Sequence, residues 1–161
     1  MDEKFVKYQG LIELTKTTED IVDMSDEISA LMYGLYHTEL YKFEKVLEQS
    51  VRLRVASEIR RLLKSYELTG KDEIKQFLSQ GYKTICALPI LRLTLAFEPS
   101  ETAINDISDW ARNNIEERII LDLTLDRRLL GGALIEYKGK YYDYSLKTKL
   151  EEIFAREDLT L

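Results

Sequence analysis

The chain has 161 residues, of which 45% are hydrophobic and 32% charged, and its formal net charge is −6 at pH 7. This balance predicts one ordinary folded domain or two small ones and argues against a disordered chain. The negative charge disfavours general nucleic-acid affinity, which requires Lys and Arg to neutralise phosphates, and the single cysteine excludes an internal disulfide and a zinc site of several thiolates.

The first half of the chain is predicted to be helical, because its apolar residues recur at three- and four-residue steps. A weak first helix contains Phe5 and Ile12 and is interrupted by Gly10. Thr17 to Asp20 are a start signal for a second helix, whose apolar positions run from Ile21 to Leu35.

Two more helices are predicted before residue 88. A single long helix begins at Leu40 and carries one apolar stripe as far as Tyr66. A shorter helix follows with Ile74 on its buried face, and Thr69 with Asp72 resembles the capping box at the start of such a helix. The helical part is thus expected to contain about four helices.

The pattern changes from helical to extended after Pro89. Ile90 to Phe97 read as a strand, and Ser100 is a natural N-cap for the helix that follows. Arg118 to Leu125 read as a second strand. Its inward face is expected to carry Ile119, Leu121, Leu123 and Leu125.

Two short strands, residues 133 to 137 and 141 to 144, are predicted to form a hairpin through Lys138-Gly139-Lys140, in which Gly139 takes a positive φ. Ser145 then caps a last helix. The residues of that helix expected to face inward are Leu146, Leu150 and Ile153.

The element order predicts an α+β fold. An N-terminal helical bundle occupies residues 1–88, and a small β-α-β-β-β-α domain occupies residues 89–161.

Side chains suited to catalysis are sparse. The single histidine, His37, lies between two predicted helices without an evident partner, so we favour a cap or surface role. Cys86 lies in an apolar run and is expected to be a small buried hydrophobe. Gly131-Gly132 precedes a strand pattern, whereas a phosphate-binding loop precedes a helix, so a phosphate site is disfavoured.

Two features leave binding open. The segment 52–64 is basic, and a solvated helix face or a docking surface for an acidic partner would each explain it. The residues that would make such a contact are Arg52, Arg54, Arg61 and Lys64. The hairpin tyrosines could stack on bases, although we favour cross-strand packing. These tyrosines are Tyr137, Tyr141, Tyr142 and Tyr144.

The stretch from Arg118 to Ile153 resembles the C-terminal domain of the delta subunit of F-type ATP synthases, the family called OSCP in mitochondria. That family shows a strand ending in Asp, a corner with two aliphatic residues and Gly-Gly, a hairpin, Asp-x-Ser and a helix with alternating basic residues. The matching residues are Asp126, Leu129, Leu130, Gly131, Gly132, Asp143, Ser145, Leu146, Lys147, Lys149 and Leu150. Arg127 and Arg128 depart from the family's Pro-Ser type pair, and Tyr144 replaces a frequent Gly.

The resemblance covers about residues 90–154 and implies a non-catalytic stator subunit without a cofactor, a metal or a bound nucleotide. The α+β domain would receive the C-terminal helix of the b subunit in the peripheral stalk. The helical domain would hold N-terminal helices of the alpha subunits in the catalytic head, so that rotation is coupled to ATP synthesis. No nucleic acid is expected, and the subunit would lie at the cytoplasmic face of the cell membrane, held there only through the complex.

The N-terminal half resembles the family less, since the family has six helices there. From the residues alone, a free-standing adaptor or a nucleic-acid-binding protein that uses the basic 52–64 face remains the alternative.

Overall fold

The computed structural model describes residues 3–37 and 40–157. The chain folds into two compact units. Unit 1 comprises residues 1–15 and 19–88, and unit 2 comprises residues 16–18 and 89–161. The division into domains 1–88 and 89–161 stays a prediction.

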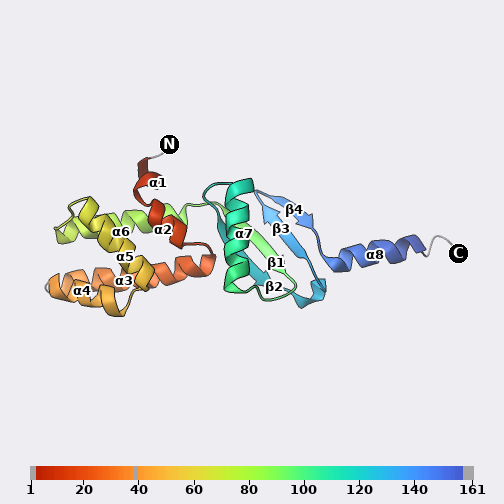
Figure 1. The fold of residues 1–161 in the computed structure, drawn as a ribbon, viewed down its shortest axis with the longest axis horizontal. Coiled ribbons are helices and arrows are strands. Elements are labelled where there is room, and N and C mark those ends of the chain that lie inside the picture. The colour runs from red at the N-terminus through yellow and green to blue at the C-terminus, as the bar shows by residue number, and fades with distance from the viewer. Residues whose placement is uncertain (1–2, 38–39, 158–161) are drawn as a thin grey trace. The chain divides into compact units, whose positions relative to one another are not determined.

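Unit 1 is helical (Figure 1). Its helices in the described residues are α1 (Glu3–Lys7), α2 (Gln9–Leu14), α3 (Thr18–His37), α4 (Leu40–Gln49), α5 (Leu53–Ser65) and α6 (Lys71–Cys86). The expected number of about four helices was therefore wrong. The first helical segment breaks at Tyr8, while Gly10 lies inside α2.

The long helix predicted from Leu40 to Tyr66 is two helices, because the chain turns before α5. Arg52 has an extended backbone, with φ −54° and ψ 135°. Its N–H donates to Oε1 of Glu27 on α3 over 2.8 Å. The buried Glu27 carboxylate thus accepts the backbone N–H that the turn leaves without a helical partner. The predicted long helix is therefore divided into α4 and α5 at this turn.

One part of the core of unit 1 lies where Tyr8, at the start of α2, packs against α6. Tyr8 is only 1% exposed, and its hydroxyl donates to the carbonyl oxygen of Phe77 over 2.9 Å. Gly81 permits this approach, since a Cβ there would lie 3.0 Å from the Tyr8 ring. The N–H of Gly70 donates to Glu73 at 3.1 Å, so the cap of α6 lies one residue beyond the predicted pair Thr69 and Asp72.

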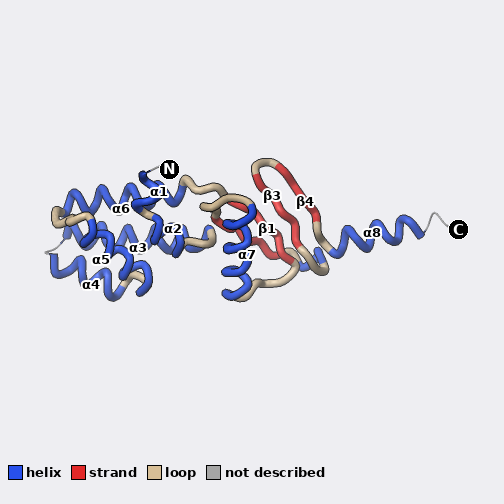
Figure 2. The backbone as a smooth tube through the Cα atoms, turned by 45° about the horizontal axis from the view of Figure 1, so that its top comes forward, coloured by secondary structure: helices blue, strands red, loops and turns tan. Residues whose placement is uncertain are grey.

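Unit 2 contains a four-stranded mixed sheet, which confirms the α+β prediction and its element order (Figure 2). The elements are β1 (Ile90–Leu95), α7 (Glu101–Asn114), β2 (Ile120–Leu125), the 3₁₀ helix η1 (Arg127–Leu129), β3 (Ala133–Tyr137), β4 (Lys140–Asp143) and α8 (Leu146–Glu157). The spatial order is β2-β1-β3-β4. β1 runs parallel to β2 and antiparallel to β3, and β3 pairs antiparallel with β4.

α7 joins the parallel strands β1 and β2 and supplies the core on one face of the sheet (Figure 1). Ser100 caps α7 as predicted, accepting from the N–H of Ala103 at 3.2 Å. The fully buried core residues are Leu91, Leu93, Leu95, Ala111, Ile119 and Leu121. Leu125, expected to face inward, is 44% exposed because it ends β2 beyond this cluster.

The segment 16–18 lies beside β2 within unit 2. The N–H of Leu121 donates to the carbonyl oxygen of Lys16 over 2.8 Å, and Thr17 makes a parallel bridge to Leu121. The ammonium of Lys16 donates to Asn105 of α7. Three residues from early in the chain therefore complete one edge of the sheet.

Candidate functional site

The corner that follows β2 is held by Asp126. Its carboxylate accepts from the N–H of Arg128 at 3.0 Å and from the Arg128 guanidinium at 2.9 Å. These bonds lower the pKa of Asp126 below its ordinary value. Leu129 is buried under the corner, whereas Leu130 takes a left-handed backbone, φ +63°, and is 64% exposed.

The two glycines of the corner differ in their backbone conformation and in the space around them. Gly132 has φ +75°, and a Cβ there would lie 2.1 Å from the carbonyl oxygen of Tyr144. The backbone therefore favours glycine at position 132 in two respects, its positive φ and its close approach to Tyr144. At Gly131 a Cβ would make only an ordinary contact with Leu146, and its carbonyl oxygen accepts the Leu146 N–H at 2.9 Å.

Asp143 and Ser145 set the beginning of α8. Ser145 is 1% exposed, and its Oγ accepts from the N–H of Thr148 over 3.2 Å. Asp143 accepts from the Ser145 N–H at 2.8 Å and from the Thr148 hydroxyl at 2.7 Å. The bond from the Ser145 backbone, followed by that from Thr148, lowers the pKa of Asp143. These hydrogen bonds fix the point at which α8 starts.

α8 leads away from the sheet (Figures 1 and 2), and most of its apolar side chains are exposed. Leu146 is 44% exposed, Ile153 51% and Phe154 61%. The prediction that Leu146, Leu150 and Ile153 face inward was wrong for Leu146 and Ile153, because the core face of the sheet is already covered by α7. We call Leu146, Leu150, Ile153 and Phe154 the α8 stripe. Their spacing suits a partner helix.

Lys147 and Lys149 flank the α8 stripe and are exposed. Lys147 lies 3.9 Å from Glu151, one turn along the helix. Both lysines can therefore reach a partner that packs against the stripe, and they remain predicted motif residues whose contacts are untested.

A groove in unit 1 is the second candidate surface. It has a volume of about 590 Å³ and is lined by residues of α6, by Leu68 and by Lys7 and Tyr8 at the N-terminal end. We call it the α6 groove. Leu68 is the partly buried apolar residue of the lining, Tyr8 and Phe77 are buried, and Gln80 and Lys83 are polar and exposed. A groove of this mixed lining can accept an amphipathic helix.

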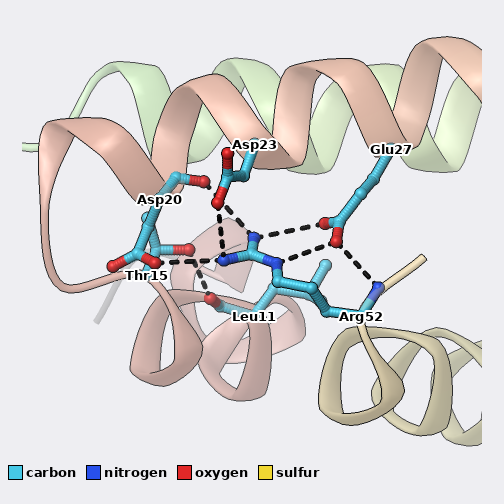
Figure 3. Close-up of polar contacts among 6 residues, drawn as sticks. All are labelled: Leu11, Thr15, Asp20, Asp23, Glu27 and Arg52. Atoms are coloured by element: carbon cyan, nitrogen blue, oxygen red, sulfur yellow. Dashed lines mark hydrogen bonds and ion pairs between the residues drawn. The ribbon is translucent and has the colours of Figure 1, made fainter. Parts of the chain in front are cut away.

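The basic stretch 52–64 does not form one open patch. Figure 3 shows Arg52 turned toward the acidic side chains of α3. Its guanidinium lies 3.0 Å from Asp20, 3.4 Å from Asp23 and 2.8 Å from Glu27. The hydrogen bond with Glu27, above all, raises the pKa of Arg52. Arg52 therefore joins α3 to the start of α5.

The other basic residues of α5 differ in their partners. Arg61 pairs with Glu58 at 2.6 Å, and Arg60 reaches Glu44 at 3.2 Å. Arg54 and Lys64 are exposed. A partner contact through Arg52, Arg54, Arg61 and Lys64 stays a prediction, and for Arg52 it would compete with three carboxylates of its own chain.

The remaining polar residues form structural contacts. In the described residues no group of three His, Cys, Asp or Glu side chains could hold a metal ion. No helix among them is long and apolar enough to cross a membrane. The side chain of His37 lies outside the described part. Cys86, expected to be buried, is exposed at the last turn of α6.

The hairpin tyrosines divide between packing and exposure. Tyr137 donates to Glu116, which also pairs with Lys138 at 2.8 Å. Tyr142 and Tyr144 stack with ring centroids 6.4 Å apart, and both are about half exposed. The predicted positive φ of Gly139 is confirmed, at +74°, but Lys140, predicted to lie in the turn, is the first residue of β4.

Sequence reasoning missed the α6 groove and the exposure of α8. Helical periodicity carries no signal for either feature, because it marks an apolar face without saying what covers it.

A protein-family model described as ATP synthase delta (OSCP) subunit matches residues 26–156. The ATP synthase subunit delta of Clostridioides difficile (strain 630) is 26% identical over 153 residues, covering 87% of this chain and 81% of that protein. The ATP synthase subunit delta of Orientia tsutsugamushi (strain Boryong) is 23% identical over 154 residues, covering 95% of this chain and 76% of that protein.

Among solved structures, a chain from the cryo-EM structure of the Polytomella F-ATP synthase in primary rotary state 3 is 19% identical to this chain. The match covers 46% of this chain and 99% of that chain, with a TM-score of 0.37. A TM-score this low supports no argument about the fold.

Proposed function

The chain belongs to the ATP synthase delta (OSCP) subunit family, and from this membership we propose that it is a non-catalytic stator subunit. It links the peripheral stalk to the catalytic head of an F-type ATP synthase, so that the head does not turn with the rotor. The observation that carries the proposal is the family match, which runs from α3 through α8 and so spans both units.

The α8 stripe is the surface proposed for the C-terminal helix of the stalk's b subunit. Three of its four apolar side chains are between 44% and 61% exposed. The motif residues Asp143 and Ser145 hold the start of the helix in place, which reduces the ordering that binding must impose. A helix that packs its apolar side chains on this stripe would bury surface that is otherwise in water.

The α6 groove is the surface proposed for an N-terminal helix of an alpha subunit. Leu68 is the partly buried apolar residue of its lining, and the rings of Tyr8 and Phe77 beside it belong to the buried core of unit 1. Two attachments in series, one on each unit, would each have to resist torque. The complex as a whole, rather than this chain, would then hold the subunit at the membrane.

The alternative nucleic-acid or adaptor role gains nothing specific from the structure. Arg52, Arg60 and Arg61 of the basic stretch each pair with carboxylates of the chain itself. We therefore propose only the stator function.

The decisive experiment measures binding of the purified full chain to two peptides by titration calorimetry. One peptide is the C-terminal helix of the cognate b subunit, and the other is the N-terminal segment of the cognate alpha subunit. Binding of both is expected. If the chain is folded by circular dichroism and one of the two peptides does not bind, the proposal is overturned.

A further inference from the structure

The ammonium of Lys7 lies over three aromatic rings at one end of the α6 groove. Its Nζ is 4.6 Å from the ring centroid of Phe77, 4.7 Å from that of Tyr66 and 5.7 Å from that of Tyr8. All three distances fall within the range of about 6 Å for cation–π attraction. We call these three rings the Lys7 cage. Their attraction holds the charge in place without neutralising it.

The cage is anchored in the core of unit 1. Tyr8 is 1% exposed, and its hydroxyl donates to the backbone of Phe77. The ring centroids of Tyr8 and Phe77 are 5.0 Å apart, and those of Tyr66 and Phe77 are 5.8 Å apart. Burial raises the pKa of Tyr8 to about 12, so its phenol stays neutral and does not become a counter-ion for Lys7. Two of the three rings that contact the ammonium, Tyr8 and Phe77, are therefore buried, while Tyr66 is 45% exposed.

The charges that line the α6 groove are mostly positive. Lys7, Lys75 and Lys83 line it, and Glu73 is the carboxylate among its lining residues. Glu73 accepts from the N–H of Gly70 at 3.1 Å, which turns it toward the start of its own helix. A positive groove on a chain of net charge −6 is complementary to an acidic segment and poorly suited to a basic one.

We propose that Lys7 is the specificity-determining charge of the α6 groove and that it selects a carboxylate on an acidic amphipathic helix of the partner. The inference rests on the proposed function, in which that helix is the N-terminal segment of an alpha subunit. The partner's apolar side chains pack against the partly buried Leu68, while an Asp or Glu on the same helix meets the caged ammonium. Because the rings already restrict Lys7, the ion pair costs less ordering than one made by a mobile surface lysine.

The test compares the cognate alpha-subunit peptide with a copy in which every Asp and Glu is changed to Asn or Gln. For the full chain, neutralising the peptide is expected to raise Kd about 3- to 10-fold at low salt. Lys7→Gln is expected to raise Kd for the acidic peptide by a similar factor and to leave Kd for the neutral peptide unchanged. Lys7→Arg keeps the charge over the rings and should retain most of the affinity.

Lys45→Gln is the matched control, since it removes the same charge from an exposed position on α4 outside the groove. The inference is overturned if the unmodified chain binds the acidic and neutral peptides with equal affinity. It is also overturned if Lys7→Gln raises Kd for both peptides by the same factor. Either result leaves the proposed function standing. The comparison of peptides on the unmodified chain decides the matter even if Lys7→Gln does not fold. Absence of any binding by the unmodified chain overturns both.

Discussion

At the scale of single residues, the three glycines of unit 2 differ in whether a side chain there would strain the backbone, clash with a neighbour, or do both. Gly132 has φ +75° and a Cβ there would meet the Tyr144 carbonyl oxygen at 2.1 Å, whereas Gly139 has φ +74° with nothing within 4 Å. Gly131 has neither constraint. One substitution to alanine at each position therefore measures a different cost.

We expect Gly132→Ala to lower the free energy of unfolding by about 3 kcal/mol or more, because strain and a backbone clash add. Gly139→Ala should cost about 1 kcal/mol from the left-handed backbone alone. Gly131→Ala should change stability by less than about 1 kcal/mol. Urea unfolding of the three variants measures these values, and equal losses at Gly132 and Gly139 would show that the close approach to Tyr144 does not matter.

Tyr8 gives the fold a dependence on alkaline pH. Its pKa is raised from 10.0 to about 12, so the folded state holds this proton more tightly than the unfolded state does. The stabilisation is full below pH 10.0 and is lost as the pH rises toward about 12. Tyr8→Phe should therefore show a smaller loss of stability than the unmodified chain over this interval, measured by urea unfolding at several pH values. Parallel curves for the two proteins would contradict the assignment.

At the scale of elements, the break between α4 and α5 depends on Glu27. Its side chain is 8% exposed and accepts from the backbone N–H and from Nε of Arg52, both at 2.8 Å. Glu27→Ala leaves a partly buried guanidinium and a backbone donor without this acceptor, so we expect a loss of about 2–4 kcal/mol. Asp23→Ala is the control, because Asp23 is 61% exposed and lies 3.4 Å from the same guanidinium. It should cost less than about 1 kcal/mol in the same unfolding experiment.

The α8 stripe should affect binding and not folding. Ile153 and Phe154 are more than half exposed, so changing both to Asp should alter the free energy of unfolding by less than about 1 kcal/mol. The same change should weaken binding of the b-subunit peptide at least about 10-fold, since it puts charge where the partner's apolar side chains pack. Val22→Asp on α3, also exposed and apolar, is the control and should leave Kd unchanged. Unaltered binding by the α8 variant would remove the stripe from the proposed contact.

At the scale of the whole molecule, the two candidate surfaces belong to different units and share no residue. Binding free energies at such separate sites usually add. We therefore expect saturation with the b-subunit peptide to change Kd for the alpha-subunit peptide by less than about twofold, measured by sequential calorimetric titration. A change of about tenfold in either order would instead reveal coupling between the surfaces, which must be reciprocal.

The sequence alone determined the order of elements in unit 2, the N-cap at Ser100, the cap at Ser145 and the positive φ of Gly139. These features follow from bonds and steric limits within a few residues, so local residue types are sufficient to predict them. The glycine corner also carried the resemblance to the family that the family model then showed.

The tertiary structure decided the features that join residues far apart in the chain. Glu27 ends the predicted long helix by accepting from Arg52, which is 25 residues away. The core position beneath the sheet is taken by α7, so the apolar stripe of α8 lies in water. Lys7 meets Phe77 and Tyr66 only once α1 is packed against α6 and against the end of α5. Periodicity shows which side of a helix is apolar, but it does not show which distant element packs against that side in the folded chain.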